Sequence, residues 1–231
     1  MTNDIMRFCV EDAIVSVSDV FQAQGMPADF SATGQLQKAL DTAREKFLQS
    51  VDPVAVCSSI DIPTFTRLFI DKQNEWDEIP TDIIIPKASR LVLFVLTLGP
   101  EIDTAIEKLF ADHEYTAGLF LDTYASLGVS KLINLLEKKT AQPGESVLAY
   151  CPGYCGWAIN AMHEILQRTN AGRIGVTLND SFLMSPLKSA GGALVAGTRF
   201  AHQFDNHYPF CADCKSKTCR QRLAHLKGNP Q

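Results

Sequence analysis

The sequence predicts an α+β fold, in which N-terminal helices precede a mixed, largely antiparallel sheet flanked by helices. Three observations favour this class. Apolar residues recur at helical spacing near the start of the chain, and short apolar runs bounded by turns follow toward the end. Between them, the apolar run over residues 91–98 ends at Gly99-Pro100, which is typical of a buried strand leading directly into a helix.

The individual elements follow from these patterns in chain order. Val10, Ile14, Val17 and Phe21 share one helical face, and a second helix is expected over residues 36–47. Further helices are expected at Pro63-Thr64 and over residues 115–138 and 157–167, and strands over residues 90–98, 146–150, 174–178 and 193–200.

Length and composition indicate one folded domain. It should comprise a helical N-terminal part (1–75), a core (76–209) and a cysteine-containing tail (210–231). A net charge of −5 argues against nucleic acid as a partner, because nucleic-acid binders concentrate Lys and Arg on one face. The longest apolar run is too short to cross a bilayer and the N-terminus does not resemble a signal peptide, so we expect no membrane contact and a cytoplasmic location.

A glycine-rich stretch, Tyr150-Cys-Pro-Gly-Tyr-Cys-Gly-Trp157, follows the predicted strand 146–150. Pro152-Gly153 should turn the chain sharply and leave backbone amides open. Gly153 and Gly156 flank Tyr154, so a flat ligand could approach the backbone beneath an aromatic ring. The alternative is a strand-to-helix connection that binds nothing.

Other polar residues allow two interpretations each. Asp122 and Ser126 share one helical face and are either ligand contacts or a solvated or hydrogen-bonded pair. Asp180, Ser181 and Lys188 either contact a ligand or cap and solvate a turn. We expect Cys9 and Cys57 to be small core residues without a function.

The tail holds three cysteines, Cys211, Cys214 and Cys219, at the spacing Cys-x2-Cys-x4-Cys. Thiolates this close can converge on zinc or on an iron–sulfur cluster, and the alternative is uncoordinated or disulfide-bonded thiols. The fourth ligand would be a small molecule or one of Cys151, Cys155, His202 and His207.

Four stretches of the chain resemble the activation domain of cobalamin-dependent methionine synthase, and more closely its short stand-alone relatives with C-terminal cysteines. They are Leu96-Thr-Leu-Gly-Pro-Glu-Ile-Asp103, Leu121-Asp-Thr-Tyr-Ala-Ser126, Cys151-Pro-Gly-Tyr154 and the stretch from Ile174 to Ser189 that contains Leu183-Met-Ser-Pro-Leu-Lys188. The resemblance covers residues from about Trp76 to Arg222 and adds little over the first seventy or so.

This resemblance implies an accessory protein for the reductive reactivation of a corrinoid-dependent methyltransferase or corrinoid protein. It would bind S-adenosylmethionine as methyl donor and face a cobalamin or other corrinoid on the partner. The family's turn motif falls on Tyr150, Cys151, Pro152, Gly153 and Tyr154, which would hold the donor through backbone groups and one aromatic ring. No catalytic residue is implied, since the protein's contribution is positioning.

The chain departs from the family at two positions. The arginine expected to bind the donor's carboxylate aligns with Ala149, and an aromatic residue expected after the Lys-Ser segment aligns near Leu194. A lost bidentate arginine contact is worth about 1.5 to 3 kcal/mol. A second interpretation is therefore a non-catalytic docking or electron-transfer module for a corrinoid protein, with a zinc or iron–sulfur site in the tail.

Overall fold

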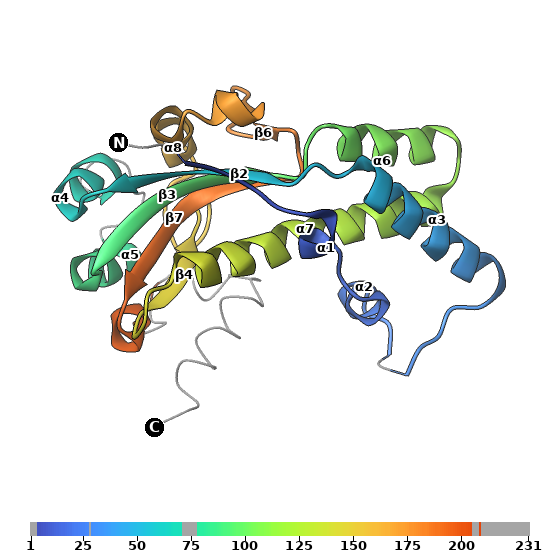
Figure 1. The fold of residues 1–231 in the computed structure, drawn as a ribbon, viewed down its shortest axis with the longest axis horizontal. Coiled ribbons are helices and arrows are strands. Elements are labelled where there is room, and N and C mark those ends of the chain that lie inside the picture. The colour runs from blue at the N-terminus through green and yellow to red at the C-terminus, as the bar shows by residue number, and fades with distance from the viewer. Residues whose placement is uncertain (1–3, 28, 71–77, 205–207, 209–231) are drawn as a thin grey trace.

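The computed structural model describes residues 4–27, 29–70, 78–204 and 208. Within them, a five-stranded sheet has the order β1-β2-β3-β7-β4, and α2, α3 and α6 lie beyond one end of it (Figure 1). Its strands are β1 (Asp4–Arg7), β2 (Val54–Ile60), β3 (Arg90–Thr97), β7 (Ser189–Gly197) and β4 (Ser146–Tyr150). All pairings described in this sheet are antiparallel, and β5 (Thr177–Leu178) pairs with β6 (Met184–Ser185) in a separate hairpin. The α+β class is confirmed.

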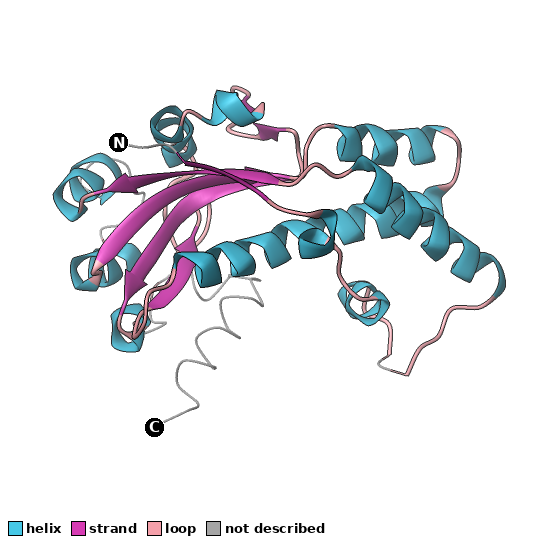
Figure 2. Cartoon of the chain, viewed as in Figure 1, coloured by secondary structure: helices cyan, strands magenta, loops and turns pink. Residues whose placement is uncertain are grey.

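Helices cover both faces of the sheet (Figure 2). The face that we call the α7 face packs against α7 (Tyr115–Thr140). The same core is extended beyond the sheet by α1 (Val10–Ala13), α2 (Val17–Ala23), α3 (Gly34–Ser50) and α6 (Glu101–Ala111). The opposite face, the α8 face, packs against α4 (Ile62–Phe65), η1 (Thr66–Ile70), α5 (Pro80–Ile84), η2 (Ile85–Lys87), α8 (Ala161–Thr169) and η3 (Ala171–Ile174). A last short helix, η4 (Arg199–His202), follows β7. No helix in this described part is long and apolar enough to span a bilayer.

Burial on both faces explains why β3 is apolar throughout. Phe94 and Leu96 belong to the core of the α7 face, whereas Leu93 and Val95 belong to the core of the α8 face. Because neither side of the strand meets water, no alternation of polar and apolar residues remains in the sequence. The predicted strand and the helix that follows it are therefore both found, with α6 beginning at Glu101.

The N-terminal part, expected to be helical, also contributes β1 and β2 to the sheet. β2 contains Cys57, Ser58 and Ser59 in its second half, so it lacks both a clean alternation and a continuous apolar run. The single helix expected from Val10 to Phe21 is divided into α1 and α2. Ser16 and Asp19 form a capping box that starts a new helix, in which the Asp19 amide donates to Ser16 Oγ at 3.2 Å.

Element boundaries differ from expectation in the C-terminal half. The helix expected from residue 157 begins at Ala161. Residues 151–157 form tight turns, and the carbonyls of residues 158–160 each accept a hydrogen bond from the amide three positions later. The strand expected over residues 193–200 is β7, which begins earlier at Ser189 and ends at Gly197. The strand expected over residues 174–178 is reduced to β5.

Two glycines allow β7 to pass close to its neighbours. A Cβ atom at Gly192 would lie 2.2 Å from the carbonyl oxygen of Tyr150, which is backbone and could move only with β4 itself. A Cβ atom at Gly191 would lie 2.7 Å from Met162 Cε, the end of a flexible side chain. The close approach of β7 to the end of β4 thus requires glycine at position 192.

The different space for a side chain at positions 191 and 192 can be tested with two alanine substitutions. We expect Gly192→Ala to lower the free energy of unfolding by about 3 kcal/mol, since the end of β4 must shift, and Gly191→Ala to lower it by about 1 kcal/mol, since Met162 can rotate. Urea unfolding followed by circular dichroism measures both values. Equal losses in the two variants would contradict the close contact between Gly192 and Tyr150.

Candidate functional site

The chain turns sharply as it leaves β4. The amide of Tyr154 donates to the carbonyl of Cys151 at 3.3 Å, across Pro152 and Gly153. Gly153 has a φ of 85°, so this segment has the pattern of a type II turn with proline and glycine at its two central positions. The predicted turn at Pro152-Gly153 is therefore present.

A second tight turn follows at once. The amide of Trp157 donates to the carbonyl of Tyr154 at 3.0 Å, across Cys155 (φ 55°) and Gly156 (φ 75°), as in a type I′ turn. The amide of Gly153 also donates to the carbonyl of Trp157 at 2.7 Å and joins the two turns. We call residues 151–157 the double turn.

The double turn corrects the expectation that its amides are open. Those of Gly153, Tyr154 and Trp157 all donate to carbonyl groups within the double turn itself. The sequence did not indicate these internal hydrogen bonds, because residue preference does not predict a second turn centred on Cys155-Gly156. What the double turn does expose is Gly153 and the side chain of Tyr154, which is 61% exposed.

The side chain of Tyr150, the last residue of β4, is buried in the core of the α8 face. Its hydroxyl lies 3.1 Å from Nδ1 of the buried His202, and Nε2 of His202 lies 3.0 Å from the carbonyl oxygen of Ser146. Since a carbonyl can only accept, Nε2 carries a proton and donates to it, and in the neutral tautomer with this proton Nδ1 accepts from the tyrosine hydroxyl. Only the backbone of Tyr150 is therefore placed to meet a ligand at the double turn.

Beside the double turn, β7 is paired with a strand on one side only. Pairing between β4 and β7 ends at Tyr150 and Ala193, whereas β7 and β3 remain paired as far as Ser189 and Thr97. Residues 189–192 thus have no strand partner on the β4 side within the described chain. Together with the double turn, they form the candidate site.

Ala149, two residues before the double turn, makes a contact that the sequence did not indicate. The amide of Ala149, on the outer edge of β4, donates to Glu137 Oε1 at 2.7 Å. Glu137 projects from the C-terminal half of α7, so a carboxylate lies next to the position where the resemblance expects an arginine. No pattern in the sequence distinguished Glu137 from the other charged residues of this helix.

Lys188, Asp122 and Ser126 meet at one point on α7. Lys188 Nζ lies 2.7 Å from Asp122 Oδ1 and donates to Ser126 Oγ at 3.0 Å, and the lysine side chain is only 16% exposed. One residue earlier, the amide of Leu187 donates to Asp103 Oδ2 on α6 at 2.6 Å. Leu187 and Lys188 therefore hold the start of β7 against both helices. In the structure Asp122 and Ser126 are both hydrogen-bonding partners of Lys188.

The tail cysteines Cys211, Cys214 and Cys219 lie outside the described residues. Within the described ranges, no group of three or more His, Cys, Asp or Glu side chains is arranged to hold a metal ion.

Cys9 and Cys57 occupy different environments. Cys57 lies on β2, and burial raises the pKa of its thiol to about 11, with a smaller contribution from Asp4. Cys9 is exposed and precedes α1, which corrects its assignment to the core. A hydrogen bond with Asp12 raises the pKa of the Cys9 thiol.

The raised pKa of Cys57 predicts a loss of stability in alkaline solution. Below pH 9.0, the ordinary pKa of a thiol, Cys57 is protonated in the folded and the unfolded protein alike. Between this pH and about 11, the unfolded chain releases the proton while the folded protein keeps it, so stability falls as the pH rises. Relative to Cys57→Ser, the native protein should lose up to about 2 kcal/mol over this range, measured by urea unfolding. A pH-independent difference would show that the buried thiol ionises normally.

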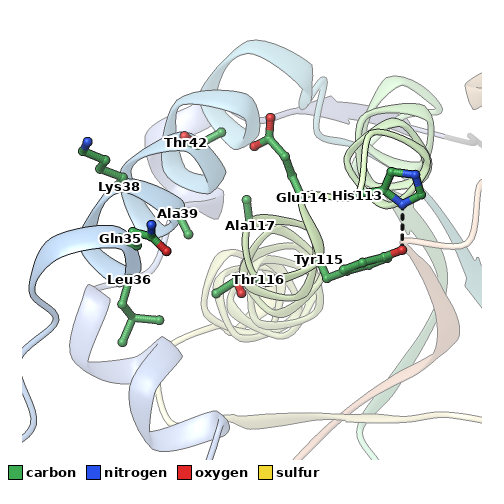
Figure 3. Close-up of a pocket in the computed structure, with 10 residues that line it drawn as sticks. All are labelled: Gln35, Leu36, Lys38, Ala39, Thr42, His113, Glu114, Tyr115, Thr116 and Ala117. Atoms are coloured by element: carbon green, nitrogen blue, oxygen red, sulfur yellow. Dashed lines mark hydrogen bonds between the residues drawn. The ribbon is translucent and has the colours of Figure 1, made fainter.

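A hollow of about 620 Å³ lies between the N-terminal half of α3 and the connection of α6 to α7 (Figure 3). His113 Nδ1 and the hydroxyl of Tyr115 lie 2.8 Å apart on one of its walls. Ala117 of this hollow and Glu137, which contacts β4, are separated along α7 by about 30 Å of helix. The hollow is therefore distinct from the candidate site.

The arrangement of strands and helices, with β4 leaving an antiparallel sheet through a glycine-rich turn, defines the fold of a methionine synthase reactivation domain. Specifically, the chain is similar to the solved structure of the MetH reactivation domain bound to AdoHcy, with a TM-score of 0.63 and 14% sequence identity. The match covers 90% of this chain and 81% of the other. At this identity the likeness shows the fold. Neither a family profile nor a curated protein matches the sequence.

Proposed function

We propose that this protein binds S-adenosylmethionine beside the double turn and serves in the reductive reactivation of a corrinoid-dependent methyltransferase or corrinoid protein, like the short stand-alone relatives that its sequence resembles. The observation that carries the proposal is the fold, since the MetH reactivation domain was solved with AdoHcy bound. S-Adenosylhomocysteine is what remains of S-adenosylmethionine once its methyl group has been transferred.

The geometry of the candidate site supports this assignment. A ligand between the double turn and β7 would meet the backbone of residues 189–192, which no strand covers on that side in the described chain. Gly153 is exposed and brings no side chain in the way, and Tyr154 offers an exposed ring to a planar group. Stacking on a ring and hydrogen bonds to exposed backbone are contacts that an adenosine moiety can make.

The protein's part in the reaction is positioning. When bound, S-adenosylmethionine supplies an electrophilic methyl group, and reactivation also requires one electron from a reductant. The double turn and the start of β7 would orient the sulfonium methyl toward the partner's corrinoid and keep water from it. Methyl transfer to a metal nucleophile needs no general base, so the proposal assigns none.

A specific observation favours a second function, that of a docking or electron-transfer module without a methyl donor. Glu137 accepts a hydrogen bond from Ala149 at 2.7 Å, which puts a negative charge at the edge where the resemblance expects an arginine. A carboxylate at this edge disfavours a ligand that carries its own carboxylate there. The two functions differ in whether S-adenosylmethionine binds at all.

Calorimetric titration with S-adenosylmethionine distinguishes them. We expect micromolar binding by the native protein, weakened about tenfold in Tyr154→Ala because a stacking contact worth about 1.4 kcal/mol is removed. Tyr115→Ala is the matched control, since Tyr115 is 57% exposed and Tyr154 61%, but Tyr115 lies at the distant hollow. Its affinity should equal that of the native protein.

Absence of binding at millimolar ligand would exclude the methyl-donor function and leave the docking module. Equal affinity in Tyr154→Ala and the native protein would place the donor away from the double turn.

A further inference from the structure

Large apolar side chains are exposed on the outer surface of α6 and α7. On α7, Tyr115 and Leu119 stand one helical turn apart and are both exposed. On α6, Phe110 is exposed as well, and its ring centroid lies 6.3 Å from that of Tyr115. The three side chains therefore belong to one apolar surface that crosses from one helix to the other.

Local contacts hold the two aromatic rings in place. The Phe110 ring packs on Gly118, where an added Cβ atom would lie 3.1 Å from Phe110 Cε2. The hydroxyl of Tyr115 lies 2.8 Å from His113 Nδ1, and its ring points away from α3 (Figure 3). Aromatic side chains that are already fixed while exposed lose little conformational entropy when another protein covers them. The surface is therefore preorganised for contact.

α7 continues this surface toward the candidate site. Asp122 follows Leu119 by one turn on the same side of the helix, and its Oδ1 lies 2.7 Å from Lys188 Nζ. Lys188 immediately precedes residues 189–192, the part of β7 that borders the candidate site. The exposed side of α7 thus leads directly to the start of β7.

α6 reaches the same point. Asp103 lies seven residues before Phe110, on the same side of α6, and accepts a hydrogen bond from the amide of Leu187. Leu187 is itself exposed. We call the four exposed residues Phe110, Tyr115, Leu119 and Leu187 the apolar strip, which ends where the candidate site begins.

The apolar strip lies in an acidic part of the chain. Residues 101–126 contain one basic residue, Lys108, and six acidic residues, namely Glu101, Asp103, Glu107, Asp112, Glu114 and Asp122. Of these, Asp122 is paired with Lys188. A second copy of this chain would bring like charges together across the strip, and an anionic membrane or a nucleic acid would be repelled too. The charge fits a protein partner whose apolar patch is bordered by lysine and arginine.

We propose that the apolar strip is the docking surface for the corrinoid-carrying protein, and that this partner presents an apolar patch with a basic border. The inference rests on the proposed function in one respect. The partner's corrinoid has to reach the candidate site, so the protein that carries it must cover the surface next to that site. The strip adds where the partner binds and which side chains it presents.

Titration with a defined probe tests the strip. The probe is the cobalamin-loaded corrinoid domain of a cobalamin-dependent methionine synthase, titrated by calorimetry into the full chain. We expect micromolar binding by the native protein and about tenfold weaker binding by Leu119→Ser, because an apolar contact is lost within the strip. Leu48→Ser is the matched control, since Leu48 is also exposed but lies on α3, and its affinity should equal that of the native protein.

Glu107 tests the charge of the partner. It is exposed and lies between Asp103 and Phe110 on α6. Glu107→Lys should weaken binding of the probe about fivefold at low ionic strength, and the difference from the native protein should shrink as salt screens the charges. Glu45→Lys makes the same change of charge on α3 and should bind the probe as the native protein does.

Titration of the same variants with S-adenosylmethionine separates this inference from the proposed function. Leu119→Ser and Glu107→Lys should bind the donor with native affinity, because neither residue belongs to the candidate site. A native protein that binds the probe but no S-adenosylmethionine would exclude the methyl-donor function and leave the docking surface intact.

Three results would overturn the docking surface. The first is probe binding by Leu119→Ser and Glu107→Lys that equals the native affinity, or losses of the same size in Leu48→Ser and Glu45→Lys. The second is absence of probe binding by the native protein. The third is a dimer of the native protein in ultracentrifugation that Leu119→Ser dissociates, since a second copy would then occupy the strip.

Discussion

The departure of β4 from the sheet at Tyr150 is the constraint on which the candidate site depends. Two contacts determine where it happens. The carbonyl of Tyr150 lies so close to Gly192 that β7 could carry no side chain there, and the hydroxyl of the same tyrosine is held by the buried His202. β4 is therefore fixed on both sides at its last residue, and the chain beyond it must turn. Had pairing continued for four more residues, the start of β7 would have been covered and no site could exist beside it.

The other boundary of the site is held by charge rather than by packing. Lys188 is largely buried and reaches both Asp122 and Ser126, which fixes the segment before β7 against α7. A half-buried ion pair with an added hydrogen bond fixes the local geometry more than it raises the stability, because desolvation offsets much of its attraction. Three of the four stretches that resemble the methionine synthase activation domain contribute residues to the contacts of Leu187 and Lys188 with α6 and α7. Their resemblance thus reflects the packing that supports the site as much as the site itself.

The sequence predicted the elements whose signals are local and missed those whose signals depend on partners. α7 carries 26 residues of helical pattern and β4 is bounded by turns, so both were found within about two residues. β2 was missed because a strand buried on both faces need not alternate, and β1, a strand at the edge of the sheet, was missed because its four residues are too few to show a pattern. The turn at Pro152-Gly153 was evident from residue preference, whereas the neighbouring one was not, because Cys155 is an unusual residue for its centre. Glu137 could not be found at all, since its importance comes from a contact with a strand edge twelve residues away.

The exchange at position 149 illustrates why a substitution must be judged with its neighbours. From the sequence alone, alanine in place of arginine removes one attraction. In the structure, the same edge of β4 also presents the Glu137 carboxylate, 2.7 Å from the Ala149 amide. At an effective dielectric constant of 20, two like charges about 5 Å apart would repel by about 3 kcal/mol, which is comparable to the loss of the arginine contact. Because Glu137 also satisfies a backbone amide at an edge strand, its charge cannot be removed without weakening that edge. A ligand that binds beside the double turn must therefore derive its affinity from ring stacking and backbone contacts, with its own negative charge turned away from α7.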